Sequence, residues 1–530
     1  MTIMKKILIK IVFIASLLTS PALYSQSYNS SIIVLDDMIV DEVVVRNYNG
    51  THEVSCGYSR PVGNYINPID NPVDRDVFLI RNLATGVITN IDTLPAGYHV
   101  RDIRFVSLYN NIEQRYEDLC VFCGDRMTII GGHWGFAPPG EPAPWIIEID
   151  YSGFVGFFYM DAALNPSSYD TIYLRDVERT KSLSRMVAYN EYNGEFNSYC
   201  GNVYTSHPVL DIVGVPADST GHPSCLARVK FYPACNDTIL WDNYINYPYY
   251  NDETIVDIAG TDHYIVTVSK KANDDKVIWV RYNQKETTYY NNGLPLTDTV
   301  FQFNLQTLIC NESLPNDLSL THYIGNPRVS SLNGNYCVLS FFAVNNENDI
   351  YFYKGVFNIK IRFPFRITTE GNYDKYSCSI IDVSNFPNEN SSVTLSKEDN
   401  NDYVIHTVRW NTTPFNLYPV YILNTGTNFK HSIDTYRNPS NTSYLHIGGS
   451  YQESNFRKWL LADHVFFTNF LNYDCFNQRI QYIPTAGIDF QILTDKRVIH
   501  FRLYEDHIHY PEKHIPMRNI TESVINQCIK

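Results

Sequence analysis

The residues that could do chemistry are few in this sequence, and several of them gather near the C-terminus. His507 and His509 are two residues apart, and side chains with this spacing on a β-strand point to the same face. Two imidazoles on one face, with carboxylates nearby, are a geometry that a metal ion can use. The alternative is a His-rich strand whose side chains are only hydrated. We favour this alternative and predict no metal site. The further titratable residues nearby are His500, Glu505, Asp506 and His514.

A second candidate is the pair His133 and Trp134, which follows two consecutive glycines. An indole ring can stack on a ligand, although a tryptophan can equally pack a loop. We take His133 and Trp134 as candidate ligand-binding residues. A cluster of acids, Glu398, Asp399 and Asp402, lacks the spaced ligands and the glycine of a calcium loop, so we interpret it as a hydrated hairpin tip.

Cys120 and Cys123 form the only CxxC of the chain, which has 11 cysteines. The surrounding residues are typical of a strand, where an odd separation sends the two side chains to opposite faces. A redox pair needs a helix N-terminus, and a structural zinc site needs a second pair of ligands. We therefore expect one buried and one variable cysteine without redox or zinc chemistry.

Local catalytic motifs are missing from the sequence. There is no GxSxG, no HExxH and no glycine-rich phosphate loop, and the sequence predicts no cofactor and no identifiable catalytic residue. Glycosidase carboxylates can come from distant segments and leave no local spacing, so an enzyme is not excluded. A protein without catalytic activity is favoured.

Charge and composition exclude one class of partner. The formal net charge is −15, and an acidic surface repels phosphate backbones, which argues against nucleic acid as a ligand. The 41 tyrosines and 28 phenylalanines favour a folded chain rich in strands.

The first 25 residues have the layout of a secretory signal peptide. Lys5, Lys6 and Lys10 make the start basic, residues 7–18 are otherwise almost entirely apolar, and Ala22 and Ser25 offer small residues for cleavage. The apolar run is too short for a permanent transmembrane helix, and no other such run follows. We expect an exported mature chain, residues 26–530, in the periplasm, outside the cell or on its surface, with no transmembrane segment.

Alternating apolar and polar residues, interrupted by turn residues, recur along the whole chain. Each pattern of this kind predicts a β-hairpin. The expected hairpins span 76–89, 145–158, 264–282, 299–310, 336–353 and 393–410. Hardly any amphipathic helix separates them, and such a spacing is typical of the four-stranded blades of a β-propeller with inserted loops.

Two glycine pairs strengthen this interpretation. Gly131-Gly132 and Gly448-Gly449 each end an apolar strand, and Trp145 and Trp459 follow further on. This pattern resembles the kelch repeat, a propeller blade with a double glycine after its second strand. The resemblance implies a loop near one mouth of the central channel at His133 and Trp134. The chain is also similar in style to uncharacterised secreted proteins of Bacteroidetes.

These observations predict an all-β chain, residues 26–530, folded as a single closed β-propeller of seven four-stranded blades. Residues 31–45 would supply an opening strand that helps close the ring, since closure removes exposed sheet edges. The alternative is a series of tandem β-sandwich domains. For function we expect a monomeric binding or scaffolding propeller for a glycan or protein ligand. The alternative is a carbohydrate-active enzyme, a glycoside hydrolase or lyase, with its site in the channel.

Overall fold

The computed structural model of the chain is all-β and contains several antiparallel sheets. The predicted signal peptide, residues 1–25, lies outside the described residues. In the part that the structure describes, no helix has the length and apolar character needed to cross a membrane. The described residues are 30–39, 42–61, 75–110, 114–134, 145–164, 171–197, 203–217, 221–233, 239–248, 251–262, 264–285, 298–304, 320–331, 336–345, 350–358, 365–369, 379–386, 391–397, 403–409, 421–423, 428–437, 442–453, 456–467, 480–484, 489–493, 498–504, 508–509 and 520–525.

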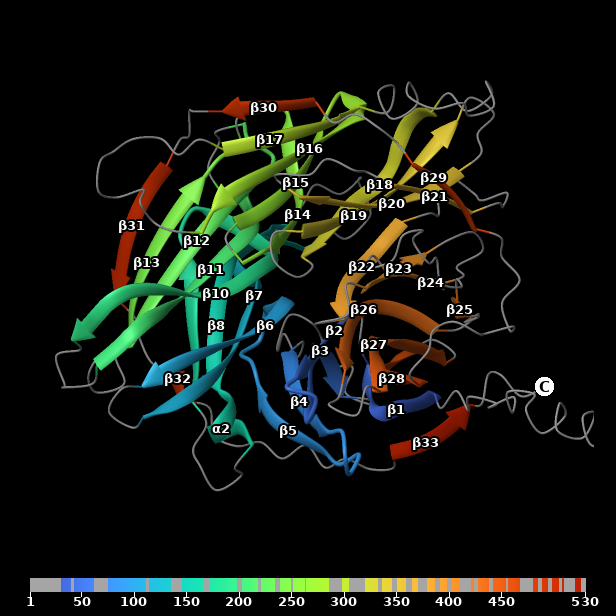
Figure 1. Cartoon of the computed structure of the whole chain (residues 1–530). Coiled ribbons are helices and arrows are strands. Elements are labelled where there is room, and N and C mark those ends of the chain that lie inside the picture. Colours follow the sequence, from blue (N-terminus) through green and yellow to red (C-terminus); the bar gives the residue numbers. More distant parts are fainter. Residues whose placement is uncertain are drawn as a thin grey trace, which may run out of the picture.

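Most strands pair with their neighbours in sequence and form antiparallel meanders (Figure 1). The first groups are β2 (Val43–Tyr48), β3 (His52–Pro61), β4 (Arg75–Asn82) and β5 (Ile88–Thr93), then β6 (Tyr98–Asn110), β7 (Arg115–Trp134), β8 (Trp145–Tyr159) and β9 (Thr171–Val177), then β10 (Thr180–Asn197), β11 (Val203–Pro216), β12 (Cys225–Pro233) and β13 (Ile239–Asn246). A short helix, α2 (Met160–Ala163), follows β8.

The second half of the chain continues in the same way. Its groups are β14 (Glu253–Gly260), β15 (Tyr264–Lys271), β16 (Asp274–Gln284) and β17 (Asp298–Asn304), then β18 (Leu320–Ser331), β19 (Tyr336–Asn345) and β20 (Ile350–Asn358), then β22 (Ser379–Phe386), β23 (Ser391–Lys397), β24 (Tyr403–Arg409) and β25 (Tyr421–Leu423), then β26 (Asn428–Arg437), β27 (Thr442–Glu453) and β28 (Phe456–Phe467).

The first strand of each group contacts the first strand of the next group. These contacts join β2 to β6, β6 to β10, β10 to β14, β14 to β18, β18 to β22 and β22 to β26, and β2 also contacts β26. The first strands of successive groups therefore lie next to one another in a series.

The N-terminal strand pairs with the C-terminal part of the chain. β1 (Ser30–Ile39) is antiparallel to β28, with Ile33 opposite Leu461, and on its other side it pairs with β33 (Ile520–Ile525). The expected opening strand within 31–45 is thus two strands, β1 and β2, in different places. Other C-terminal strands extend earlier groups: β29 (Ile480–Pro484) pairs with β21 (Phe365–Thr369), β30 (Asp489–Leu493) with β17, β31 (Val498–Tyr504) with β13 and β32 (Ile508–His509) with β9.

Four of the predicted hairpins are confirmed: β4–β5, β15–β16, β19–β20 and β23–β24. The hairpin expected within 299–310 is described only in its first strand, β17. The hairpin expected at 145–158 is wrong, because β8 runs through it as one strand. Gly153 is not a turn residue there: a Cβ at this position would overlap the side chains of Thr180 and Leu183, so the glycine permits close approach of the next group.

The largest apolar core lies between the first three groups. It contains the fully buried rings of Phe78, Phe122, Phe154 and Phe158, and Phe157 stacks on Phe231 with ring centroids 4.9 Å apart. Each such side chain contributes about 1.5–3 kcal/mol when buried. The abundance of aromatic residues is therefore used, at least here, for packing between sheets.

The CxxC illustrates the consequence of this packing. Cys120 and Cys123 are both fully buried, so the expectation of one buried and one variable cysteine is wrong. Their side chains do point to opposite faces, but β7 is covered on both sides: Cys120 interacts electrostatically with Cys56, and Cys123 lies beside the Leu183 carbonyl. Burial raises the pKa of both thiols well above its ordinary value.

Candidate functional site

Charged residues recur at one position of the first strands. In these strands the pairing register shifts by a β-bulge, and the residue after the bulge faces the middle of the molecule. Acidic and basic residues alternate at this position along the chain until the last strand, which carries a serine. The residues are Asp102, Arg185, Asp257, Arg328, Asp382 and Ser432.

Each of the three aspartates binds the backbone of the next first strand. Asp102 Oδ2 accepts a hydrogen bond from the Met186 amide at 3.0 Å, Asp257 Oδ2 from the Val329 amide at 2.8 Å, and Asp382 Oδ2 from the Ile433 amide at 3.1 Å. Charge-assisted bonds of this kind are stronger than neutral ones. The aspartates therefore tie neighbouring strand groups together.

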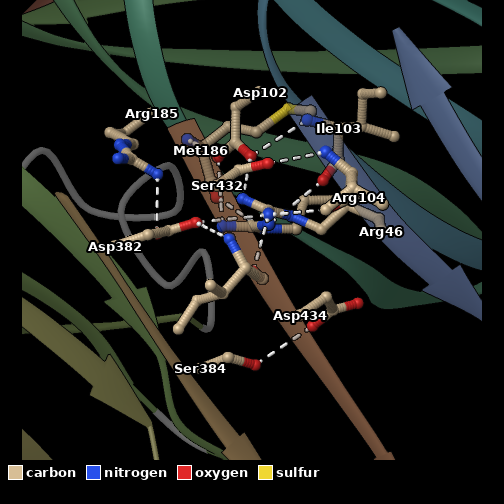
Figure 2. A network of polar contacts seen from close by, with 12 residues as sticks. Arg46, Asp102, Ile103, Arg104, Arg185, Met186, Asp382, Ser384, Ser432 and Asp434 are labelled. Carbon is tan, nitrogen blue, oxygen red and sulfur yellow. Dashed lines mark hydrogen bonds and ion pairs between the residues drawn. The ribbon is translucent and has the colours of Figure 1, made fainter. Parts of the chain in front are cut away.

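Arg46, from β2, lies between two of these aspartates (Figure 2). Its Nη2 is 2.7 Å from Asp102 Oδ1, and its Nη1 is 3.4 Å from Asp382 Oδ2. Arg104 reaches the other oxygen of Asp102 at 3.0 Å, and Arg185 reaches Asp382 Oδ1 at 3.0 Å. We call this set, with Asp257 and Arg328, the central layer.

The electrostatics of the central layer keep Asp382 ionised. Burial by itself would raise its pKa, but Arg185 and Arg46 outweigh burial and lower the pKa from 3.8 to about 2. Asp257 behaves oppositely: burial raises its pKa, and Arg328 and Arg185 offset this only in part. A carboxyl like Asp382, held by two guanidinium groups, is a poor proton donor near neutral pH.

Two hollow regions lie at the opposite ends of the first strands, on either side of the central layer. The first is a cavity of about 450 Å³ lined by residues that follow the central layer in each strand, among them Phe105, Ser331 and Asn385. The second consists of two adjoining cavities of about 680 and 560 Å³, lined by residues that precede the layer. We call the second region the Lys181 mouth.

The Lys181 mouth carries side chains that can bind a polar ligand. Lys181, Asn326 and Tyr151 are exposed, and 46% of Tyr151 is accessible to solvent. His431 is half-buried. Arg101 also lines it and is held by Asp125 and Glu42. Hydrogen-bonding groups around a concave surface, with an aromatic ring at its edge, are typical of small-ligand sites.

The predicted ligand residues His133 and Trp134 are the last two residues of strand β7, where their backbones pair with Ile146 and Trp145, so the expectation that they lie in a loop is wrong. The structure describes their backbones only. Arg126 of β7 pairs with Tyr98, the first residue of β6. From there β7 continues to Trp134 on the side of the Lys181 mouth, a length of roughly 26 Å at about 3.3 Å per residue. Whether they bind a ligand stays a prediction.

Two other groups of candidate residues are only partly described. His509 lies in β32 and His500 in β31, as backbone only, while His507 and the acids Glu398, Asp399 and Asp402 lie outside the described residues. Among the described residues, no group of three or more His, Cys, Asp or Glu side chains is placed to hold a metal ion.

The sequence contains only a weak signal for the central layer. The order apolar, any residue, Asp, apolar starts at Val100, Ile255 and Ile380, where it includes the three clamping aspartates, but it also starts at Leu35, Leu174 and Val209. Only the contacts between strand groups reveal what these aspartates bind.

Comparisons with known proteins assign no family. No family model and no curated protein matches the chain. Among solved structures it is similar to a protein of unknown function from Dyadobacter fermentans DSM 18053, at 10% identity over 82% of this chain and 97% of that one, with a TM-score of 0.35. It is also similar to the intramolecular trans-sialidase from Ruminococcus gnavus, at 7% identity over 79% and 93%, with a TM-score of 0.25. At these TM-scores neither likeness assigns an activity to the chain.

Proposed function

We propose that this protein is an exported binding propeller without catalytic activity, and that it takes a glycan or protein ligand at the Lys181 mouth. The fold part of this proposal is a single closed ring of seven blades, kelch-like in its glycine pairs. The export part rests on the signal-peptide layout of residues 1–25.

The contacts between first strands support the ring. Each group contacts the next, and β2 contacts both β6 and β26, so the series of contacts returns to its start. β1 would complete the last blade as its fourth, outermost strand by pairing with β28, which covers the outer edge of β28. The glycine pairs lie in β7 and β27, the second strands of their groups, but both strands continue past the glycines and do not end there as the kelch-like pattern has it.

Limited proteolysis tests the ring against tandem β-sandwich domains. A closed ring should be nicked in loops yet keep its pieces together, because the blades remain packed on one another. Stable, separable fragments of about 100–200 residues would contradict the ring.

N-terminal sequencing of protein from the native host tests export. The mature chain should begin near Leu23 or Gln26, and recovery of Met1 would contradict cleavage of the signal peptide.

The contacts of Asp102 and Asp382 are the observation on which we propose binding and not catalysis. Asp102 and Asp382 both bind arginines and backbone amides, and in this state they hold strands together. A glycosidase needs one carboxyl free to donate a proton and a second free to attack or to activate water. The Lys181 mouth, in contrast, offers exposed hydrogen-bonding side chains around a hollow.

A carbohydrate-active enzyme remains the second candidate, and Asp257 is the observation that favours it. Its raised pKa suits a proton donor, and its partner Arg328 lines the Lys181 mouth. However, Asp257 is buried and accepts the Val329 amide, so a substrate would have to displace the contacts that surround it.

A panel of polysaccharides distinguishes the two functions. The purified protein is tested for retention on each polysaccharide and, separately, for release of reducing ends. We expect retention without release, and release from any polysaccharide would favour the enzyme. Tyr151→Ala should weaken retention about tenfold, as loss of a contact worth more than 1 kcal/mol does. Tyr116→Ala is the matched control and should bind like the wild type. Tyr116 is also an exposed tyrosine, but it lies near the start of β7, whereas Tyr151 of β8 pairs with Met127 further along that strand.

A further inference from the structure

The Lys181 mouth concentrates positive charge in an acidic protein. The whole chain has 41 lysines and arginines against 56 aspartates and glutamates. The two adjoining cavities of the mouth have the opposite balance: among the described residues that line them, the acidic ones are Glu42 and Asp125, both bound to Arg101. The basic lining residues are Arg46, Arg101, Lys181, Arg185, Lys270 and Arg328.

Among the arginines of the mouth, Arg328 has the longest ion pair. Its Nη1 donates to the Val256 carbonyl at 3.1 Å, and its approach to Asp257 Oδ1, at 3.8 Å, is too long for a hydrogen bond. Its Nε is buried without a hydrogen-bond partner. By comparison, Arg46 and Arg185 each contact a carboxylate oxygen at 3.0 Å or less.

Arg185 adds a second guanidinium group to the same two cavities. Burial lowers the pKa of Arg328 below its ordinary value, and repulsion by Arg185 lowers it further, while Asp257, Asp382 and Asp102 raise it in part. An anion bound between the two guanidinium groups would offset this repulsion, and planar guanidinium groups match the geometry of carboxylate and sulfate oxygens.

The shape of the mouth favours a glycan over a protein surface as the carrier of that anion. Two adjoining hollows of about 680 and 560 Å³ can each enclose a ligand of the size of one or two sugar rings. Hydroxyl and amide groups from Ser182, Ser184 and Asn326 lie around the cations and suit sugar hydroxyls.

We infer that the Lys181 mouth binds the carboxylate or sulfate group of an acidic glycan, with Arg328 and Lys181 as its principal cationic contacts. This inference rests on the proposed binding function and specifies its ligand. The anion would offset the repulsion between Arg185 and Arg328, so the ligand should also raise the melting temperature of the protein.

Calorimetric titration of the full mature chain with matched pairs of glycans tests the inference. Oligogalacturonate and its methyl ester differ in the carboxylate charge, and dextran sulfate and dextran differ in the sulfate. We expect at least one acidic member to bind roughly ten times or more tighter than its neutral counterpart, and this difference should shrink as salt is added. Which acidic member binds identifies the oxyanion.

Variants locate the site. Arg328→Gln and Lys181→Gln should each weaken binding of the acidic glycan by roughly tenfold or more. Arg328→Gln also removes the cation beside buried Asp257, so its melting temperature is measured alongside its affinity. Lys181 is exposed, so Lys181→Gln should fold even if Arg328→Gln does not. Arg115→Gln, at an exposed arginine beside α2, is the matched control and should bind like the wild type.

Three results would overturn the inference. They are equal binding of acidic and neutral glycans, unchanged affinity in both mouth variants, and absence of binding to every glycan. The first leaves the proposed binding function intact, because a neutral glycan is still bound. The second leaves a binding protein with its site elsewhere. The third contradicts glycan binding altogether.

Discussion

Replacing Asp382 by asparagine should destabilise the protein, because this side chain joins three strand groups. Its carboxylate contacts Arg185 from β10 at 3.0 Å and Arg46 from β2 at 3.4 Å, and it accepts the Ile433 amide of β26 at 3.1 Å. Asparagine keeps the shape and one acceptor oxygen, but it removes the negative charge that faces two buried guanidinium groups.

The magnitude follows from the pKa of Asp382. Its folded value of about 2 lies below the ordinary value of 3.8, a difference worth about 2 kcal/mol at neutral pH. The side chain is 7% exposed, so little solvent screening reduces this figure. Removal of one partner from a buried ion pair costs about 3–5 kcal/mol in general. We therefore expect Asp382→Asn to lose about 2–5 kcal/mol of unfolding free energy at pH 7.

Chemical denaturation of wild type and variant, monitored by tryptophan fluorescence from pH 7 to pH 2, measures this loss. Because the folded pKa of Asp382 is depressed, its charge stabilises the protein fully above pH 3.8, and this contribution is lost as the pH falls through about 2. The difference between the two proteins should therefore shrink between pH 4 and pH 2. Asp275→Asn, on an exposed hairpin tip, is the control and should stay within about 0.5 kcal/mol. A loss below about 0.5 kcal/mol at pH 7, or a difference that persists undiminished at pH 2, would refute the reasoning.

Three further predictions concern the strands and the thiols. Gly448→Ala should cost about 1–3 kcal/mol in chemical denaturation, because its Cβ would lie 3.1 Å from Val43 Cγ1, and a neutral effect would contradict the close approach of β27 and β2. Ile33→Pro should lower the melting temperature far more than Ile33→Ala, since proline cannot donate to the strands beside β1; equal effects would contradict the pairing with β28 and β33. Burial raises the thiol pKa of Cys120 and Cys123, so iodoacetamide should label them only after unfolding, and peptide mapping of labelled native protein should find both unmodified.

Hairpins whose turn residues lie at the surface could be predicted from the sequence. The tip at 272–275 is polar and flanked by alternating residues, and β15 and β16 pair across it as expected. The prediction failed at Gly153, because a glycine that permits two sheets to approach has the same letter as a glycine that turns the chain. Only the position of Thr180 and Leu183 beside it distinguishes the two uses.

The candidate site was much harder to predict. The central layer combines Arg46, Asp102, Arg185 and Asp382, which are separated by more than 50 residues at each step along the chain. Local spacing carries no information about such a site, since the partners meet only when the first strands of different groups come together. The residues singled out from the sequence, His133 and Trp134, lie instead at the end of the long strand β7.

The sequence by itself determined the all-β class, the negative net charge and the positions of most hairpins, because composition, strand periodicity and turn preferences are properties of the chain or of short segments. It also contains the export signal that we propose. The tertiary structure alone decided that Cys120 and Cys123 are both buried, that β1 pairs with the distant β28, and that Arg328 lies 3.8 Å from Asp257 in a mouth lined by other basic residues. These properties depend on which strand groups become neighbours, and that is settled by packing between residues far apart in the chain.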